Sequence, residues 1–172
     1  GVYHFEPTTL SLDVIREGDY RGVLAAATNH RGVGDAPLSV VTTSTWWRNA
    51  WKYRDRTYRH AFWDSGTLLA NLLATAHALD HRAEVVLGFA DDVVARLLGV
   101  DTDREAPLEV VPVGSGDPVT GADRRTPESV TPIDPETKPL SETEPEFPLV
   151  QAAYAASNLP DGEAATAWRS PP

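Results

Sequence analysis

A basic aromatic segment, residues 46–59, holds the side chains best suited to carry chemistry. It places five of the 15 basic residues and five aromatic residues in fourteen positions, in a chain of formal net charge −10. Lys52 lies among four arginines, whose like charges disfavour its protonated ammonium and favour a role as general base. Tyr53 beside it can donate or relay a proton. The pair suits removal of a proton while a hydride leaves for an acceptor.

A structural interpretation of the same segment stays open at this point. The arginines could pair with acidic surface elsewhere, and the tryptophans could belong to the core. The segment alone does not decide between the two interpretations.

The elements around this segment indicate a mixed α and β fold. Residues 2–5 and 10–14 predict a hairpin, because short β-rich runs flank a turn that contains Pro7. Residues 19–27 predict a short helix. Residues 38–43 are rich in β-branched side chains and predict a buried strand.

A long core helix is predicted over residues 59–79, where apolar residues recur at helical spacing without a proline. Residues 84–89 predict a strand that ends at Gly88. A helix over residues 91–98 is expected to open on two aspartates and to close at Gly99. Residues 108–113 predict a last strand.

The composition changes after this strand. Residues 115–146 hold six prolines, eight acidic residues and no aromatic residue, which predicts a disordered linker. Residues 147–172 predict an amphipathic helix and the start of a possible second domain. Since the chain begins with Gly1 and lacks methionine, we expect it to be a piece of a longer protein.

A series of motifs over residues 1–114 resembles the SagB-type dehydrogenases of the nitroreductase superfamily, the oxidases that turn azolines into azoles in modified peptides. The matching stretches are Trp51-Lys52-Tyr53-x-x-Arg56-x-Tyr58-Arg59, Asp64-x-Gly66, Asn71, Gly88-Phe89-x-Asp91-Asp92, Leu97-Leu98-Gly99-Val100-Asp101, Glu105-Ala106-Pro107-Leu108 and Val111-Pro112-Val113-Gly114. The resemblance implies an α+β fold of the FMN-dependent nitroreductase type, with residues 1–114 as the C-terminal half of one domain.

The resemblance also implies a site. Lys52 and Tyr53 are carried over as the catalytic pair, and the turn at Leu87, Gly88 and Phe89 falls where the family places backbone beside the flavin ring. A backbone donor there would stabilise negative charge on reduced flavin. The same motif suggests supporting roles for Arg56, Tyr58, Arg59 and Asn71.

Two departures from the family pattern bear on these roles. Thr67 stands where many relatives have a histidine, and nothing before Lys52 supplies the arginine-rich grip on the FMN phosphate. We therefore expect a homodimer or a partner nitroreductase-like half to complete the site, with a small molecule or a peptide as substrate. The alternative is a non-catalytic nitroreductase-like subunit or scaffold without bound flavin.

The charge balance argues against nucleic acid or an anionic membrane as partner. Acid excess with only two lysines fits a halophilic source, and an ordinary acidic cytosolic protein fits equally well. The chain lacks cysteine, a signal sequence and any apolar run of membrane-spanning length, so we expect a cytoplasmic location.

Three weaker patterns favour plain structural roles. His77 and His81 have metal-compatible spacing without a set of carboxylates, so no metal site is expected. Residues 114–116 resemble a strand end more than a phosphate loop. Ser65 lacks the context of a nucleophile elbow.

Overall fold

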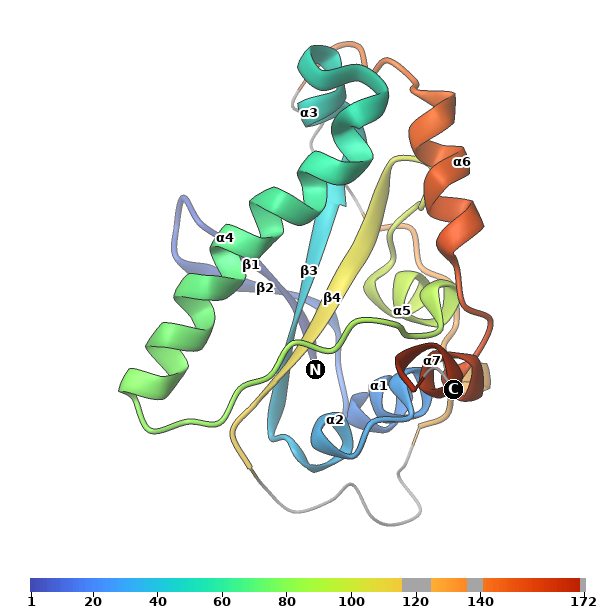
Figure 1. Cartoon of the computed structure of the whole chain (residues 1–172). Helices are drawn as coiled ribbons and strands as arrows, with labels where there is room; N and C mark the ends of the chain where they lie inside the picture. Colours follow the sequence, from blue (N-terminus) through green and yellow to red (C-terminus); the bar gives the residue numbers. More distant parts are fainter. Residues whose placement is uncertain (116–124, 136–140, 171–172) are drawn as a thin grey trace.

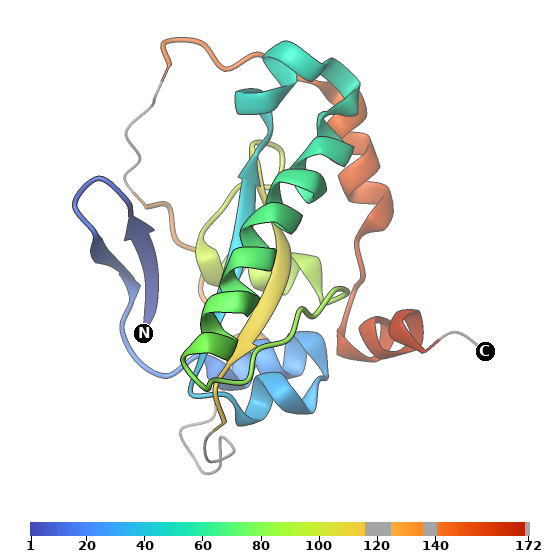
Figure 2. The ribbon, with the colours of Figure 1, turned by 60° about the vertical axis from the view of Figure 1, so that its left-hand side comes forward.

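A two-stranded antiparallel ribbon forms the centre of the molecule. The computed structural model describes residues 1–115, 125–135 and 141–170. Strand β3 (Leu38–Thr45) pairs with β4 (Glu105–Val113), and the register shifts between Thr42 and Thr43. Figures 1 and 2 show helix α4 (Thr57–Ala78) along one face of this ribbon and helix α5 (Asp91–Leu98) on the other. The expected combination of α and β elements is confirmed.

The hairpin expected at the start of the chain is also confirmed. Strands β1 (Val2–Glu6) and β2 (Ser11–Arg16) pair antiparallel and project from the body (Figure 2). Arg16 anchors the hairpin, because its guanidinium donates hydrogen bonds of 2.8 Å to the carbonyls of Leu97, Arg96 and Thr131.

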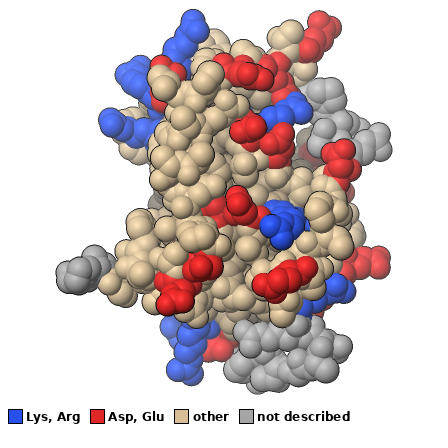
Figure 3. Space-filling model, turned by 90° about the vertical axis from the view of Figure 1, so that its right-hand side faces the viewer, with Lys and Arg blue, Asp and Glu red and all other residues tan. Residues whose placement is uncertain are grey.

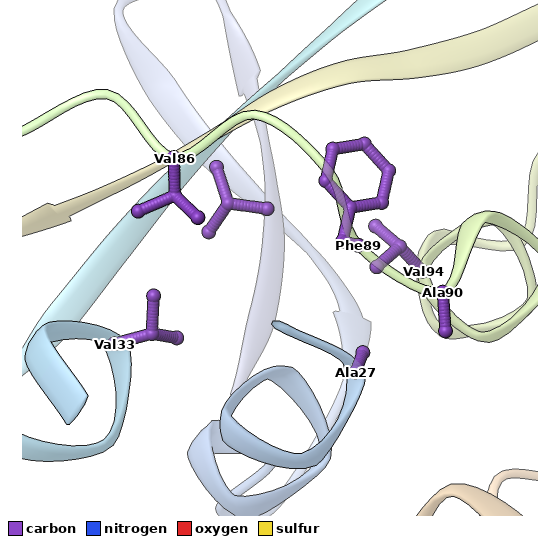
Figure 4. Packing of buried hydrophobic residues seen from close by; sticks show 7 residues of the cluster. Ala27, Val33, Val86, Phe89, Ala90 and Val94 are labelled. Atoms are coloured by element: carbon purple, nitrogen blue, oxygen red, sulfur yellow. The ribbon is translucent and has the colours of Figure 1, made fainter. Parts of the chain in front are cut away.

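Helices α1 (Arg21–Thr28) and α2 (Arg31–Asp35) pack beneath the ribbon, so the short helix expected over residues 19–27 is confirmed. They contribute Ala27 and Val33 to the main core. Figure 4 shows this core closing on Val86, Phe89 and the first residues of α5. Its buried members are Ala27, Val33, Val86, Phe89, Ala90, Val94 and Val110.

The long helix α4 is confirmed, but its role as a core helix holds for one narrow stripe only. The buried residues of α4 are Thr57, Ala61, Ser65, Leu69 and Ala76, mostly at four-residue spacing. Trp63 and Leu68 on the other sides are 57% and 51% exposed. A ribbon of two strands is too narrow to cover more than one stripe of a helix, since a wider sheet is needed to bury a broader face.

The expectation of a buried strand at residues 38–43 is wrong in one respect. The strand forms, but none of the β3 residues is buried, whereas β4 is buried from Ala106 to Pro112. The reason is position in the sheet. Strand β4 has β3 on one side and the bridges Ala83↔Val113 and Val86↔Val110 on the other.

The strand expected over residues 84–89 does not form. Within these residues the isolated bridge Val86↔Val110 connects the segment to β4, and Ala83 just before it bridges to Val113. Val86 N donates to Val110 O at 2.8 Å, and Val110 N donates to Val86 O at 3.2 Å. Gly88 then turns the chain away with φ of +78°. Helix α5 and the last strand are confirmed, and Gly99 closes α5 in the left-handed conformation.

The C-terminal third is packed more closely than a linker composition suggests. Residues 116–124 and 136–140 of the expected linker lie outside the described residues. Between them runs a short 3₁₀ helix, η2 (Pro127–Ser129), and Val130 after it is buried against Val23 and Leu97. One apolar side chain of this region thus packs in the core, and the disordered linker over residues 115–146 stays a prediction.

A helix forms in the region expected to be an amphipathic helix, α6 (Pro148–Ser157), and α7 (Gly162–Arg169) follows it. Val150 and Tyr154 of α6 are buried in a second cluster with Trp46 and Ala61. Asp161 caps α7 by accepting a hydrogen bond of 2.8 Å from Ala164 N. Both helices pack on the body of this chain, and a second domain beginning at residue 147 stays a proposal.

Candidate functional site

The segment singled out for chemistry begins with an anchored tryptophan. Trp46 opens helix α3 (Trp46–Tyr53) directly after β3 and is buried. Its backbone N donates to Arg104 O at 2.9 Å, and its Nε1 donates to Thr102 O at 3.0 Å. These bonds fix the position of α3, so the core interpretation of the tryptophans holds for Trp46. It does not hold for Trp51, which is 64% exposed.

Lys52 and Tyr53 lie on the outer side of α3. The Lys52 side chain is exposed, and its Nζ is 5.1 Å from the centre of the Tyr53 ring. Tyr53 stacks on His60 with ring centres 3.9 Å apart, and the His60 ring meets the Trp63 ring edge-on at 4.8 Å. A row of three rings therefore continues from the catalytic candidates onto α4.

The arginines of this segment do not neutralise acidic surface. Among the described residues, Lys52 and the four arginines at positions 48, 54, 56 and 59 make no ion pair with a carboxylate. The chain turns sharply here, since Arg54 adopts φ of +53° and ψ of −137° at the start of the 3₁₀ helix η1 (Arg54–Arg56). Side chains other than glycine rarely adopt this conformation. The ion-pair interpretation of the arginines is not supported within the described part of the chain.

The supporting residues named from the motif have separate environments. Tyr58 donates a hydrogen bond of 2.9 Å to Ser157 Oγ and packs against Trp46, so it connects α4 to α6. The guanidinium of Arg59 lies 6.0 Å from the centre of the Trp63 ring, and Arg56 is exposed. Asn71 is exposed about 21 Å along α4 from Thr57, at 1.5 Å per residue. Asn71 is therefore not part of the Lys52 surroundings.

The turn expected to contact flavin has one exposed and one buried side chain. Leu87 is exposed, whereas Phe89 is 3% exposed and belongs to the main core (Figure 4). The Gly88 carbonyl accepts a hydrogen bond of 2.7 Å from Arg169 Nη1 of α7. No acceptor within the described residues receives a hydrogen bond from the backbone N–H of Leu87, Gly88 or Phe89. Three successive backbone donors at this turn thus have no acceptor among the described residues.

The two halves of the predicted site do not meet in this chain. Figure 1 shows α3 at the upper end of the ribbon, whereas the segment that enters α5 crosses the ribbon lower down and lies near α7. The sequence motif places Lys52 and Gly88 in one site, and one copy of the chain leaves them apart.

Sequence reasoning missed a buried carboxylate between β4 and α4. Glu109 is 2% exposed and accepts hydrogen bonds from Ser65 Oγ at 2.7 Å and from Thr42 Oγ1. The available signal was an acidic residue in the middle of an otherwise apolar strand. Ser65, for which a plain structural role is expected, lies eight residues inside α4 and holds this carboxylate.

A second buried carboxylate holds the connection between α6 and α7. Asp91 accepts a hydrogen bond of 2.8 Å from Leu159 N, and Asp91 N donates to Leu159 O at 3.2 Å. Burial raises the pKa of the Asp91 carboxyl, and it also raises the pKa of the nearby Tyr154 hydroxyl. The pair therefore favours its neutral forms.

A shallow hollow of about 440 Å³ lies elsewhere, between α5 and the chain around Ile133. Neither Lys52, Tyr53 nor the Gly88 turn lines it.

Figure 3 shows acidic and basic side chains scattered over the face that carries α6 and α7, without a continuous basic patch. In the part of the chain that the structure describes, no three potential ligands gather into a metal site, and no helix has the length and apolar character needed to cross a membrane.

Comparison with known proteins places this chain in a family. The model of the nitroreductase family matches residues 7–115, more than half of the chain, so the chain belongs to the nitroreductase family. The resemblance noted from the motifs is confirmed at this level.

Particular relatives support the same assignment. The chain is 27% identical over 113 residues to the microcin B17-processing protein McbC of Escherichia coli, covering 63% of this chain and 41% of that protein. A putative nitroreductase from Anabaena variabilis shares the fold with a TM-score of 0.70 and 27% identity, over 92% of this chain and 32% of the other. The chain thus spans less than half the length of each of these two proteins.

A third comparison concerns the fold alone. The structure of the E. coli microcin synthetase McbBCD complex with truncated pro-MccB17 bound contains a chain with a TM-score of 0.60 and 23% identity. The match covers 67% of this chain and 44% of that one. The nitroreductase fold expected from the sequence is therefore confirmed.

Proposed function

We propose that this chain is part of an FMN-dependent oxidoreductase of the SagB type, in which a hydride passes between substrate and flavin. The observation that carries the proposal is that the sequence motifs and the family match cover overlapping residues. The ordered motifs run from Trp51 to Gly114, and the family match runs from residue 7 to 115. The similarity to a microcin-processing protein supports a peptide or a small molecule as substrate.

The Gly88 turn fits one edge of a flavin. Its N–H groups have no acceptor among the described residues, and one of them belongs to the buried Phe89, whereas buried backbone donors in a folded protein are nearly always paired. A bound flavin would accept the hydride and gain negative charge. Backbone N–H groups held in place beside it would stabilise that charge without reorganisation.

Lys52 and Tyr53 are proposed to handle the proton. The ammonium of Lys52 is exposed, has no carboxylate partner among the described residues and lies against the Tyr53 ring. Stacking on His60 restricts the orientation of the Tyr53 ring. This arrangement leaves both polar groups available to a substrate.

A partner surface is needed to bring the two parts of the site together. Since Lys52 and the Gly88 turn lie apart in one chain, we propose that a second copy or a nitroreductase-like partner half completes the site (Figure 1). The family member McbC is named in a complex of several subunits, which is compatible with this proposal.

A second candidate function is a nitroreductase-like subunit that organises a complex without flavin. The lack of an arginine-rich phosphate grip before Lys52 favours this function if these 172 residues are the whole polypeptide. Adding FMN to the complete purified protein and measuring bound flavin after gel filtration separates the two. Retained flavin supports the oxidoreductase, and protein that stays colourless supports the scaffold.

A further inference from the structure

Helix α7 contacts the Gly88 turn in two ways. Arg169 Nη1 donates a hydrogen bond of 2.7 Å to the Gly88 carbonyl. A Cβ at position 88 would lie 2.7 Å from Cε3 of Trp168, so the indole packs directly over the glycine. Trp168 therefore covers one face of this turn, and Arg169 holds its carbonyl in place.

The Arg169 guanidinium is itself anchored. Its Nη2 donates a hydrogen bond of 2.6 Å to the carbonyl of Thr28, the last residue of α1. Carbonyls at a helix C-terminus lack helical partners and favour a cation. A further bond of 3.0 Å joins Asn29 Nδ2 to Thr166 Oγ1, one turn before Arg169. The guanidinium is thus held between α1 and the turn.

Because a peptide group is planar, holding the Gly88 carbonyl also fixes the direction of the Phe89 N–H. No peptide in the described chain is cis, and in a trans peptide the C=O and N–H bonds point in opposite directions. The bond to the Gly88 carbonyl therefore directs the Phe89 N–H away from Arg169. That N–H has no acceptor within the described residues.

We propose that Arg169 is a positioning residue of the flavin site, which orients the Gly88–Phe89 peptide so that the Phe89 N–H is presented as a donor to the flavin. This inference rests on the proposed function. It adds a residue from the C-terminal helix, 81 positions away from Gly88 in the sequence, to a site that the motifs confine to residues 52–89. Arg169 does not touch the flavin in this proposal and acts only through the peptide that it holds.

The test measures the midpoint potential of bound FMN in the complete protein and its variants. Arg169→Ala should retain FMN and lower the potential, because a loosened donor stabilises the reduced flavin less. Arg169→Lys keeps the positive charge but cannot make the same pair of bonds to two carbonyls. Its potential should fall between those of Arg169→Ala and the parent protein. Arg31→Ala, an exposed arginine that pairs with Asp35, is the matched control and should leave the potential unchanged.

The outcomes separate this inference from the proposed function. A parent protein that takes up no FMN overturns both. A parent protein that binds FMN, with an unchanged potential in Arg169→Ala, overturns the role of Arg169 alone. A lowered potential in Arg169→Ala with a parental value in Arg169→Lys also overturns it, because charge and not orientation would then be responsible. If Arg169→Ala loses FMN, the Arg169→Lys potential decides: a lower value supports the inference and a parental value overturns it.

Discussion

The carboxylate of Glu109 on β4 accepts a hydrogen bond of 2.7 Å from the hydroxyl of Ser65 on α4. Glu109 is buried, and no cation pairs with it among the described residues. Two hydroxyl groups, from Ser65 and Thr42, are its partners. This bond connects the ribbon to the helix that continues from the Lys52 segment.

Glu109→Ala should therefore destabilise the fold. The substitution leaves two buried hydroxyl groups without their acceptor, which costs roughly 1–3 kcal/mol in the free energy of unfolding. Urea denaturation measures the change. Glu105→Ala is the matched control, because Glu105 is on the same strand and accepts from Thr43 at an exposed position. The control should change stability by less than about 0.5 kcal/mol, and an equal loss in both variants would contradict the role of the buried bond.

Asp91→Asn should stabilise the protein near neutral pH. Burial raises the pKa of Asp91 above its ordinary value of 3.8, so ionisation of this carboxyl opposes folding. Asparagine keeps an oxygen that can accept the bond from Leu159 N and removes that unfavourable ionisation. The free energies of unfolding of the two proteins are compared across pH.

The sign of the pH dependence is fixed by the same shift. As pH falls through the raised pKa toward 3.8, Asp91 becomes protonated in the folded state first, and the parent protein gains stability relative to the variant. The advantage of Asp91→Asn should therefore shrink on acidification. An advantage that grows on acidification would show that folding favours the ionised carboxylate.

Gly88→Ala should strain the turn and loosen α7. A residue with a side chain at positive φ costs roughly 1–2 kcal/mol, and the added Cβ would also contact the Trp168 ring. Combining it with Trp168→Ala should recover part of the loss in a double-mutant cycle. Additive effects would show that the indole does not pack on this glycine in solution.

The control for this substitution is another glycine. Gly66 lies inside α4 with nothing near the position of an added Cβ. Gly66→Ala should therefore stabilise the helix by up to about 1 kcal/mol. Opposite effects of the same replacement at positions 66 and 88 would isolate the contribution of the turn.

Lys52→Ala in the complete protein should leave FMN bound and slow flavin reduction by the substrate. Loss of a general base typically slows the chemical step by about 100- to 10,000-fold. Stopped-flow absorbance of the flavin follows the rate. Arg31→Ala changes an exposed cation on α2, outside the basic aromatic segment, and should leave the rate close to the parental value. Equal rates in the parent and Lys52→Ala would remove Lys52 from the mechanism.

Local patterns in the sequence were sufficient to predict most elements. The hairpin, α4, α5 and β4 each depend on spacing and end signals within a short window, such as Gly99 after α5. Those signals act between neighbouring residues, so they can be interpreted without the fold. Two features depend instead on which strands pair: β3 lies at an edge, and residues 84–89 form no strand. A local window of the sequence does not contain that information.

The candidate site shows the same division. The motif around Lys52 is contiguous and was visible in the sequence, whereas Arg169 reaches Gly88 and Thr28 across more than 80 positions. Both of these hydrogen bonds end on backbone carbonyls, which every residue type carries, so the sequence does not mark them. Only the packing of α7 reveals the connection.

The flavin site proposed for Lys52 and the Gly88 turn can be observed in a structure of the complete protein with FMN bound. It should place the backbone N–H groups of the Gly88 turn within hydrogen-bond distance of the flavin ring. It should also place the Lys52 ammonium in a cleft that opens onto the same ring, with a second chain or domain forming the opposite wall. A Lys52 side chain on open surface, away from every flavin, would contradict the proposed chemistry.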